Sequence, residues 1–269
     1  MTEVFAALST SAWTSFARKT YAVADMEVRK LLHDPTELGT RAIQPALWLV
    51  VFGQVMARAR VLDSGNVPYL DFLVPGILAQ SVLFVSIFNG ISVIWERDLG
   101  IVHKFLASPT PRAALVLGKG MAGGARAVTQ AVVVLVLAAF LGAKLQWTVL
   151  SMAGVLLLSL LGALLFSTFS LIIACLVKTR ERFMGVGQVL TMPLFFASSA
   201  IYPTSIMPHW LQVLVHFNPL TYQIDGLRAF LLPDSTLSPL GITADLLVMS
   251  LTLLVLVAIC ARTYPNIVR

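Results

Sequence analysis

Six long apolar windows dominate this sequence and limit it to a membrane fold. A helix needs about 20 mostly apolar residues to cross the roughly 30 Å hydrocarbon layer of a bilayer. The chain has 269 residues, of which 58% are hydrophobic and only 12% are charged. The windows are 38–57, 72–95, 121–143, 149–177, 183–201 and 240–261. We therefore expect an all-α membrane protein in which residues 1–269 form a single domain with six transmembrane helices.

The third window has two charged residues near its start. Lys119 and Arg126 lie seven residues apart and so share one face of a helix. Long basic side chains near the end of a span can extend their charged groups to the membrane surface. We expect both side chains to reach toward one interface.

The distribution of basic residues predicts the orientation, because cytoplasmic loops carry an excess of Lys and Arg. A cytoplasmic N-terminus leaves Arg58, Arg60, Lys144 and Arg228 outside and puts most other loop cations inside. We expect a multi-pass protein of a bacterial cell membrane with both termini in the cytoplasm. The net charge of +6 then reflects loops that face anionic lipid, and no basic module for nucleic acid is expected.

An amphipathic helix is predicted before the first span, over 14–35. Apolar residues recur there at three- and four-residue steps, and Pro35 ends the pattern. The opposite side carries Arg18, Lys19, Arg29 and Lys30. Such a helix lies in the membrane interface with its basic face toward lipid headgroups.

The cytoplasmic loop 96–111 has a charge pattern that suits a docking element. Glu96, Arg97 and Asp98 alternate in sign before Gly100, and Lys104 follows in a short helical stretch that two prolines end. The alternative is a solvated loop whose charges only fix the topology.

The segment 202–232 is too apolar for an ordinary outer loop. Pro203, Pro208 and Pro219 divide it into short helices, and Tyr202 and Trp210 suit the headgroup boundary. Turns at membrane depth are tolerated only where protein or water covers them. We expect a re-entrant helical hairpin that packs on neighbouring spans.

Several motifs together resemble ABC-2 type permeases, and the branch that they resemble most is the daunorubicin-resistance type of drug and lipid exporter. The resemblance extends from the amphipathic helix to the last span. The motifs are Tyr69-x-x-Phe72-Leu73-x-Pro75-Gly76, Glu96-Arg97-x-x-Gly100, Ser108-Pro109 with Arg112 and Gly118-Lys119, and Tyr202-Pro203, Pro208-x-Trp210, Asn218-Pro219-Leu220-Thr221-Tyr222, Asp225 and Arg228.

The resemblance implies a half-transporter, in which two copies form the pathway and separate ATPase subunits bind beneath. The chain has no GxxxxGK[ST] loop, so we expect ATP and Mg on the ATPase partner and no cofactor on this chain. The family pattern assigns ATPase coupling to Glu96, Arg97, Asp98, Gly100 and Lys104. It assigns the outer gate to Tyr202, Pro203, Pro208, Trp210, Asn218 and Pro219.

The expected cargo is an amphipathic drug, lipid or glycolipid that leaves the cytoplasm or the inner leaflet. Candidate lining residues are Gln54, Gln80, Ser86, Asn89, Gln188 and Thr191, although such groups also bond helix to helix. We expect no catalytic residues and no metal site, because the four His residues are scattered without ligand spacing. The alternatives are export of a polysaccharide or lipid-linked glycan, a gradient-driven secondary transporter and a membrane scaffold.

Overall fold

In the residues that it describes, the computed structural model contains helices joined by turns and irregular segments, and no strands. These are residues 40, 43–59, 67–102, 112–177, 179–232 and 241–264. The predicted amphipathic helix 14–35 and Lys104 lie outside the described residues, as does the predicted coupling loop from residue 103 onward.

The described chain forms a bundle of long helices with three short ones at one end. The first helix, 43–59, contains a π-helical part η1 (Trp48–Gly53) and ends as α3 (Gln54–Ala59). The others are α4 (Tyr69–Phe88), α5 (Gly90–Asp98), α7 (Arg112–Phe140), α8 (Val149–Leu176), α9 (Arg180–Phe196), the 3-10 turn η2 (Thr204–Ile206), α10 (His209–Phe217), α11 (Pro219–Leu231) and α12 (Ile242–Thr263).

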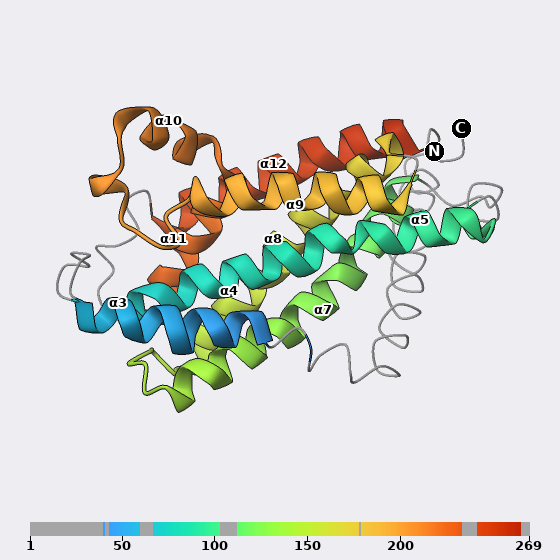
Figure 1. Cartoon of the computed structure of the whole chain (residues 1–269). Coiled ribbons are helices and arrows are strands. Elements are labelled where there is room, and N and C mark those ends of the chain that lie inside the picture. Colours follow the sequence, from blue (N-terminus) through green and yellow to red (C-terminus); the bar gives the residue numbers. More distant parts are fainter. Residues whose placement is uncertain are drawn as a thin grey trace, which may run out of the picture.

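The two ends of the bundle differ in their contents (Figure 1). At one end, called here the α10 end, α10 lies next to α11, and α11 packs against α4, α8 and α12. The opposite end, called the α5 end, contains the tip of α5 and the start of α9. Helices α4 and α8 are central, since α4 packs against α7, α8, α9, α11 and η1, while α8 also packs against α11 and α12.

Four described helical segments are long and apolar enough to cross a membrane: Tyr69–Asp98, α7, α8 and α12. Their burial differs, because 78% of the apolar stretch in Tyr69–Asp98 is buried but only 17% of that in α12. The predicted first and fifth windows overlap the first helix and α9, and α9 has only 17 residues. The six-span arrangement therefore stays a prediction.

Two glycines allow close contacts between segments of the bundle: Gly76 on α4 and Gly90 at the start of α5. A Cβ on Gly76 would overlap the Ala200 carbonyl, so only glycine lets α4 approach that backbone. A Cβ on Gly90 would overlap the Ser170 hydroxyl. That hydroxyl accepts a hydrogen bond from the Gly90 amide at 3.0 Å, at the point where α4 gives way to α5.

Polar side chains set the starts of three helices. The Thr148 hydroxyl accepts from the Ser151 amide at the start of α8, and the Thr179 hydroxyl accepts from the Arg182 amide at the start of α9. Asn218 does the same for α11, with Pro219 at the first helical position. Each cap satisfies an amide that has no partner within the helix.

Candidate functional site

The α5 end presents a small charged tip. Asp98 is exposed there, and its carboxylate accepts from Arg97 at 3.1 Å and from Arg180 at 2.7 Å. The Arg180 guanidinium also lies 3.5 Å from the centre of the Trp95 ring, so the start of α9 is held against α5. Leu99 is 69% exposed beyond these charges. Gly100 has a φ of 71°, which lets the chain turn sharply after the tip.

Glu96 is directed into the bundle instead of toward the tip. Its carboxylate accepts from the Lys119 ammonium at 2.5 Å, and the two side chains are only 8% and 2% exposed. The expectation that Lys119 extends to the membrane surface is therefore wrong. Helix α7 begins at Arg112, nine residues before the predicted window, so Lys119 lies inside the helix and faces α5. In a low-dielectric interior a charge is stable only when it is paired.

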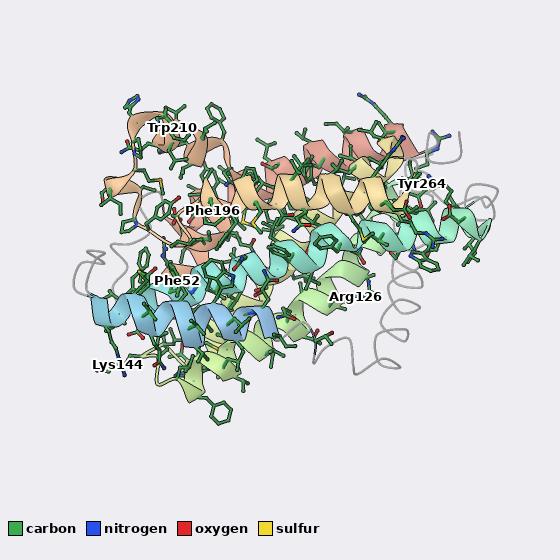
Figure 2. All side chains as sticks on the ribbon, in the orientation of Figure 1. Phe52, Arg126, Lys144, Phe196, Trp210 and Tyr264 are labelled. Carbon is green, nitrogen blue, oxygen red and sulfur yellow. The ribbon has the colours of Figure 1, made fainter. Side chains whose placement is uncertain are left out.

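Tyr264 extends the environment of this ion pair to the end of α12. Its ring is fully buried beside the α5 end (Figure 2). Burial raises the pKa of the Tyr264 hydroxyl, and the negative charge of Glu96 raises it further. Tyr264, directly after α12, thus lies near the buried carboxylate that joins α5 to α7.

A second polar contact joins α4 to α7. The side chain of Asn89 donates to the Lys119 carbonyl at 3.2 Å and accepts from Arg126 at 2.6 Å. Arg126 is half-buried, and Figure 2 shows it beside α7. Asn89, predicted as a lining residue, thus holds the break between α4 and α5 against α7.

The predicted gate residues lie together at the α10 end. Trp210 is 65% exposed on α10, and Figure 2 places it at the tip of this end. Tyr202 donates to the Phe196 carbonyl at 2.6 Å, where α9 finishes. Partial burial raises the pKa of the Tyr202 hydroxyl, which favours this neutral donor form. Pro203 precedes the turn η2, and Pro208 precedes α10.

Asn218 joins α9 to α11. Its amide group donates to the carbonyls of Leu194 and Ala197, both at 2.6 Å, and its oxygen accepts from the Leu220 amide at 3.0 Å. The two carbonyls belong to the end of α9, where such groups have no partner within the helix. One side chain therefore satisfies one helix end and starts another.

A buried Arg links α11 to the chain after α9. Arg228 is 3% exposed, donates to the Ser199 carbonyl and lies 4.0 Å above the Phe72 ring. Asp225 accepts from Arg228 at 3.5 Å and from the Ser199 hydroxyl at 3.1 Å. These contacts hold the segment before η2 between α4 and α11.

The six predicted lining residues do not share one surface. Gln80, Ser86, Asn89 and Thr191 are buried, whereas Gln54 and Gln188 are exposed on α3 and α9. Thr191 donates to the Gly187 carbonyl of its own helix at 2.6 Å. Gln80 and Ser86 lie on α4, at the centre of the bundle.

The sequence-based site omitted three charged residues that the structure makes central: Lys119, Asp225 and Arg228. Each is a charge in an apolar neighbourhood, and that signal predicts a partner. The identity of the partner could not be read from the sequence, because Lys119 and Glu96 are 23 residues apart on different helices.

An all-helical chain with four segments suited to a bilayer is a polytopic membrane protein. The sequence model described as "ABC-2 type transporter" matches residues 18–232. This chain therefore belongs to the ABC-2 type transporter family, a family of transport permeases.

Individual relatives agree with this family. The transport permease ycf38 of Cyanophora paradoxa is 30% identical, over 74% of this chain and 69% of the relative. The daunorubicin resistance permease DrrB1 of Streptomyces coeruleorubidus is 24% identical, over 73% of this chain and 69% of the relative. The inner membrane transport permease YadH of Escherichia coli K12 is 27% identical, over 69% of this chain and 72% of the relative.

Proposed function

We propose that this chain is the permease subunit of an ATP-driven exporter for an amphipathic drug, lipid or glycolipid. Two copies would form the pathway, and a separate ATPase subunit on each would hydrolyse ATP with Mg. The observation that carries the proposal is the charged tip at the α5 end, anchored in the bundle by the buried Glu96–Lys119 pair. This arrangement, in a family of transport permeases, suits a part that receives force from a partner.

The tip would be the ATPase contact. Arg97 and Asp98 give it both signs of charge, and Leu99 adds an exposed apolar group at its apex. Gly100 and Lys104 would complete the contact. Because Glu96 is bonded to Lys119, a displacement of the tip would be passed to α7 and not absorbed in a loose loop.

The α10 end would be the outer gate. Tyr202, Pro203, Pro208 and Trp210 define the short elements there, and Asn218 with Pro219 ties them to α9 and α11. Packed helices tend to have discrete arrangements. A movement of α4 or α9 could therefore reposition this hairpin as a unit. Under this proposal the hairpin is re-entrant and contacts the outer leaflet.

The second copy would contact α9. This helix packs on α4 and α5 but leaves Val189, Met192 and Phe196 exposed on its other side. Nearby, Phe195 faces the bundle and packs edge-on against Trp48 at 5.6 Å. A helix with one anchored face and one open apolar face suits an interface within the membrane.

The proposed topology has six spans, with the first helix and α9 joining the four long helical segments. Both termini and the α5 end would face the cytoplasm of a bacterial cell, and the α10 end would face outward. The half-buried Arg180 and the exposed Arg182 at the α5 end support this orientation through the excess of cytoplasmic cations.

Purification from the native membrane in nanodiscs tests the function. We expect a P-loop ATPase to copurify at about one copy per permease chain, identified by mass spectrometry, and ATP hydrolysis by the complex. If no ATPase copurifies while a permease dimer stays intact, a gradient-driven carrier becomes the better interpretation.

A further inference from the structure

A polar pocket lies between the first helix, α4 and α7. Its volume is about 310 Å³, within the lower range of small-molecule sites. The lining combines amides and hydroxyls with two phenyl rings. The lining residues are Thr40, Gln44, Pro45, Gln80, Ser81, Phe84, Val85, Phe88 and Gln130.

Gln80 is the distinctive group in this pocket. It is 3% exposed, and its amide makes no hydrogen bond to any residue that the structure describes. Its neighbour Ser81 behaves differently, because the Ser81 hydroxyl donates to the Ile77 carbonyl of its own helix at 2.8 Å. The Gln80 amide is open to the pocket, so it can bond to water or to a polar ligand that enters there. Gln80 therefore offers both a donor and an acceptor to a polar group in the pocket.

The pocket favours a ligand group without charge. None of its nine lining residues is ionised at neutral pH, and three of them, Gln44, Gln80 and Gln130, carry an amide that both donates and accepts. The nearby cation Arg126 is directed to Asn89, with a contact of 2.6 Å. An anionic headgroup would thus enter a space with no cation among its lining residues, whereas a sugar hydroxyl, ester or amide would find matching partners.

An apolar groove continues from the same pocket. It has a volume of about 580 Å³ and runs along the first helix, where Leu47, Val51 and Val55 are among its lining residues. Thr40 and Gln44 line both the pocket and the groove, so the two spaces meet there. A polar pocket that opens into an apolar groove fits a molecule with a polar head and a hydrocarbon tail.

We propose that this pocket binds the uncharged, hydrogen-bonding head of an amphipathic molecule and that the groove holds its tail. Gln80 recognises the head from α4, and Gln44 recognises it from the first helix. The proposal builds on the export function above and adds to it a ligand class and a binding position. The pocket would bind neutral amphiphiles, such as glycosyl diacylglycerols, in preference to anionic phospholipids.

Photo-crosslinking tests this assignment with two probes that carry the same diazirine beside the head group: monoglucosyl diacylglycerol and phosphatidylglycerol. The full chain is placed in nanodiscs that contain either probe, and the labelled peptides are mapped by mass spectrometry. We expect the glucosyl probe to label peptides that contain residues 80–88 and 130. Equal labelling of these peptides by the phosphatidylglycerol probe would overturn the ligand class.

Three variants make the test specific. Gln80→Leu keeps the side-chain size and removes the amide, so labelling by the glucosyl probe should fall about tenfold, the scale of one lost hydrogen bond to a buried polar group. Gln44→Leu changes an exposed residue and should lower labelling without affecting folding. Thr252→Val on α12 removes a hydroxyl that bonds only within its helix and should leave labelling unchanged. Unchanged labelling in both Gln variants would contradict the proposal.

The result does not depend on the proposed function, because labelling needs neither ATP nor an ATPase. A copurifying ATPase together with glucosyl labelling elsewhere would overturn the pocket and leave the exporter in place. Specific labelling here without any ATPase would support the pocket and count against the exporter.

Discussion

The two ends of the bundle both contain buried charges, but they use them differently. At the α5 end, Glu96 and Lys119 join α5 to α7 through a direct ion pair of 2.5 Å. At the α10 end, Arg228 contacts a backbone carbonyl and an aromatic ring, and its acid Asp225 is 3.5 Å away. The first end therefore fixes helix to helix, whereas the second fixes a short connecting segment to helices. A rigid link suits a part that transmits force, and a held segment suits a part that opens.

The largest expected effect concerns the Glu96–Lys119 pair. Lys119→Met removes one partner and leaves a carboxylate buried, which should destabilise the protein by about 3–5 kcal/mol. Unfolding in detergent, followed by circular dichroism, measures the change. The matched control is the double variant Glu96→Gln and Lys119→Met, which should be more stable than Lys119→Met alone. A double variant whose loss equals the sum of the two single losses would show that the pair is not coupled.

The buried Arg at the α10 end should matter somewhat less. Arg228→Met removes the donor to Ser199 and leaves Asp225 with one bonding partner fewer, so we expect a loss of about 2–4 kcal/mol. Arg228→Lys keeps the charge but loses the planar group above Phe72. The stability of this variant should lie between that of the Met variant and that of the native protein. The same unfolding measurement applies. If the Lys and Met variants were equally stable, the charge would contribute nothing. The ring contact and the geometry of the guanidinium would then explain the whole loss of stability.

Asn218 has two roles that substitutions can separate. Asn218→Ala removes the cap of α11 and the donor to two carbonyls of α9, with an expected loss of about 1–2 kcal/mol. Asn218→Asp retains the capping oxygen but places a carboxylate oxygen against the two carbonyl oxygens, so its loss should be larger than that of the Ala variant. An Asp variant more stable than the Ala variant would mean that the cap outweighs this repulsion.

The smallest effect is expected at the exposed tip. Asp98→Asn weakens the contacts to Arg97 and Arg180, and exposed ion pairs contribute little to the stability of a fold. Added salt should remove most of the difference between this variant and the native protein. A loss as large as that of Lys119→Met would mean that the tip supports the fold itself and is not simply a surface for a partner.

The sequence predicts the apolar helices well, because each needs only a run of residues that lipid accepts. The third window shows the limit of this approach. Its prediction stopped at residue 121, since Lys119 breaks the apolar run, but the helix continues back to Arg112 because Glu96 neutralises that charge from another helix. Contacts of this kind depend on how helices pack, and no local pattern contains them.

The candidate site likewise combines features that local sequence predicts with features that depend on helix packing. The proline pattern correctly marked where short elements begin at the α10 end, since proline fixes its own backbone locally. The charge pattern, in contrast, groups Glu96 with its charged neighbours for docking, although Glu96 faces Lys119 inside the bundle. Whether a charged side chain faces the bundle or the solvent depends on how its helix is rotated about its own axis. Three alternating charges at the end of a helix do not determine that rotation.

In the proposed function, the α5 end engages an ATPase and the α10 end does not. A photo-reactive benzoylphenylalanine can replace Leu99 or Trp210, which are 69% and 65% exposed at opposite ends. Illumination of native membranes, followed by mass spectrometry of the crosslinked species, then identifies what each end contacts. We expect a P-loop ATPase to be crosslinked to position 99 and none to be crosslinked to position 210. An ATPase captured at position 210, or none at position 99 while the complex copurifies, would contradict it.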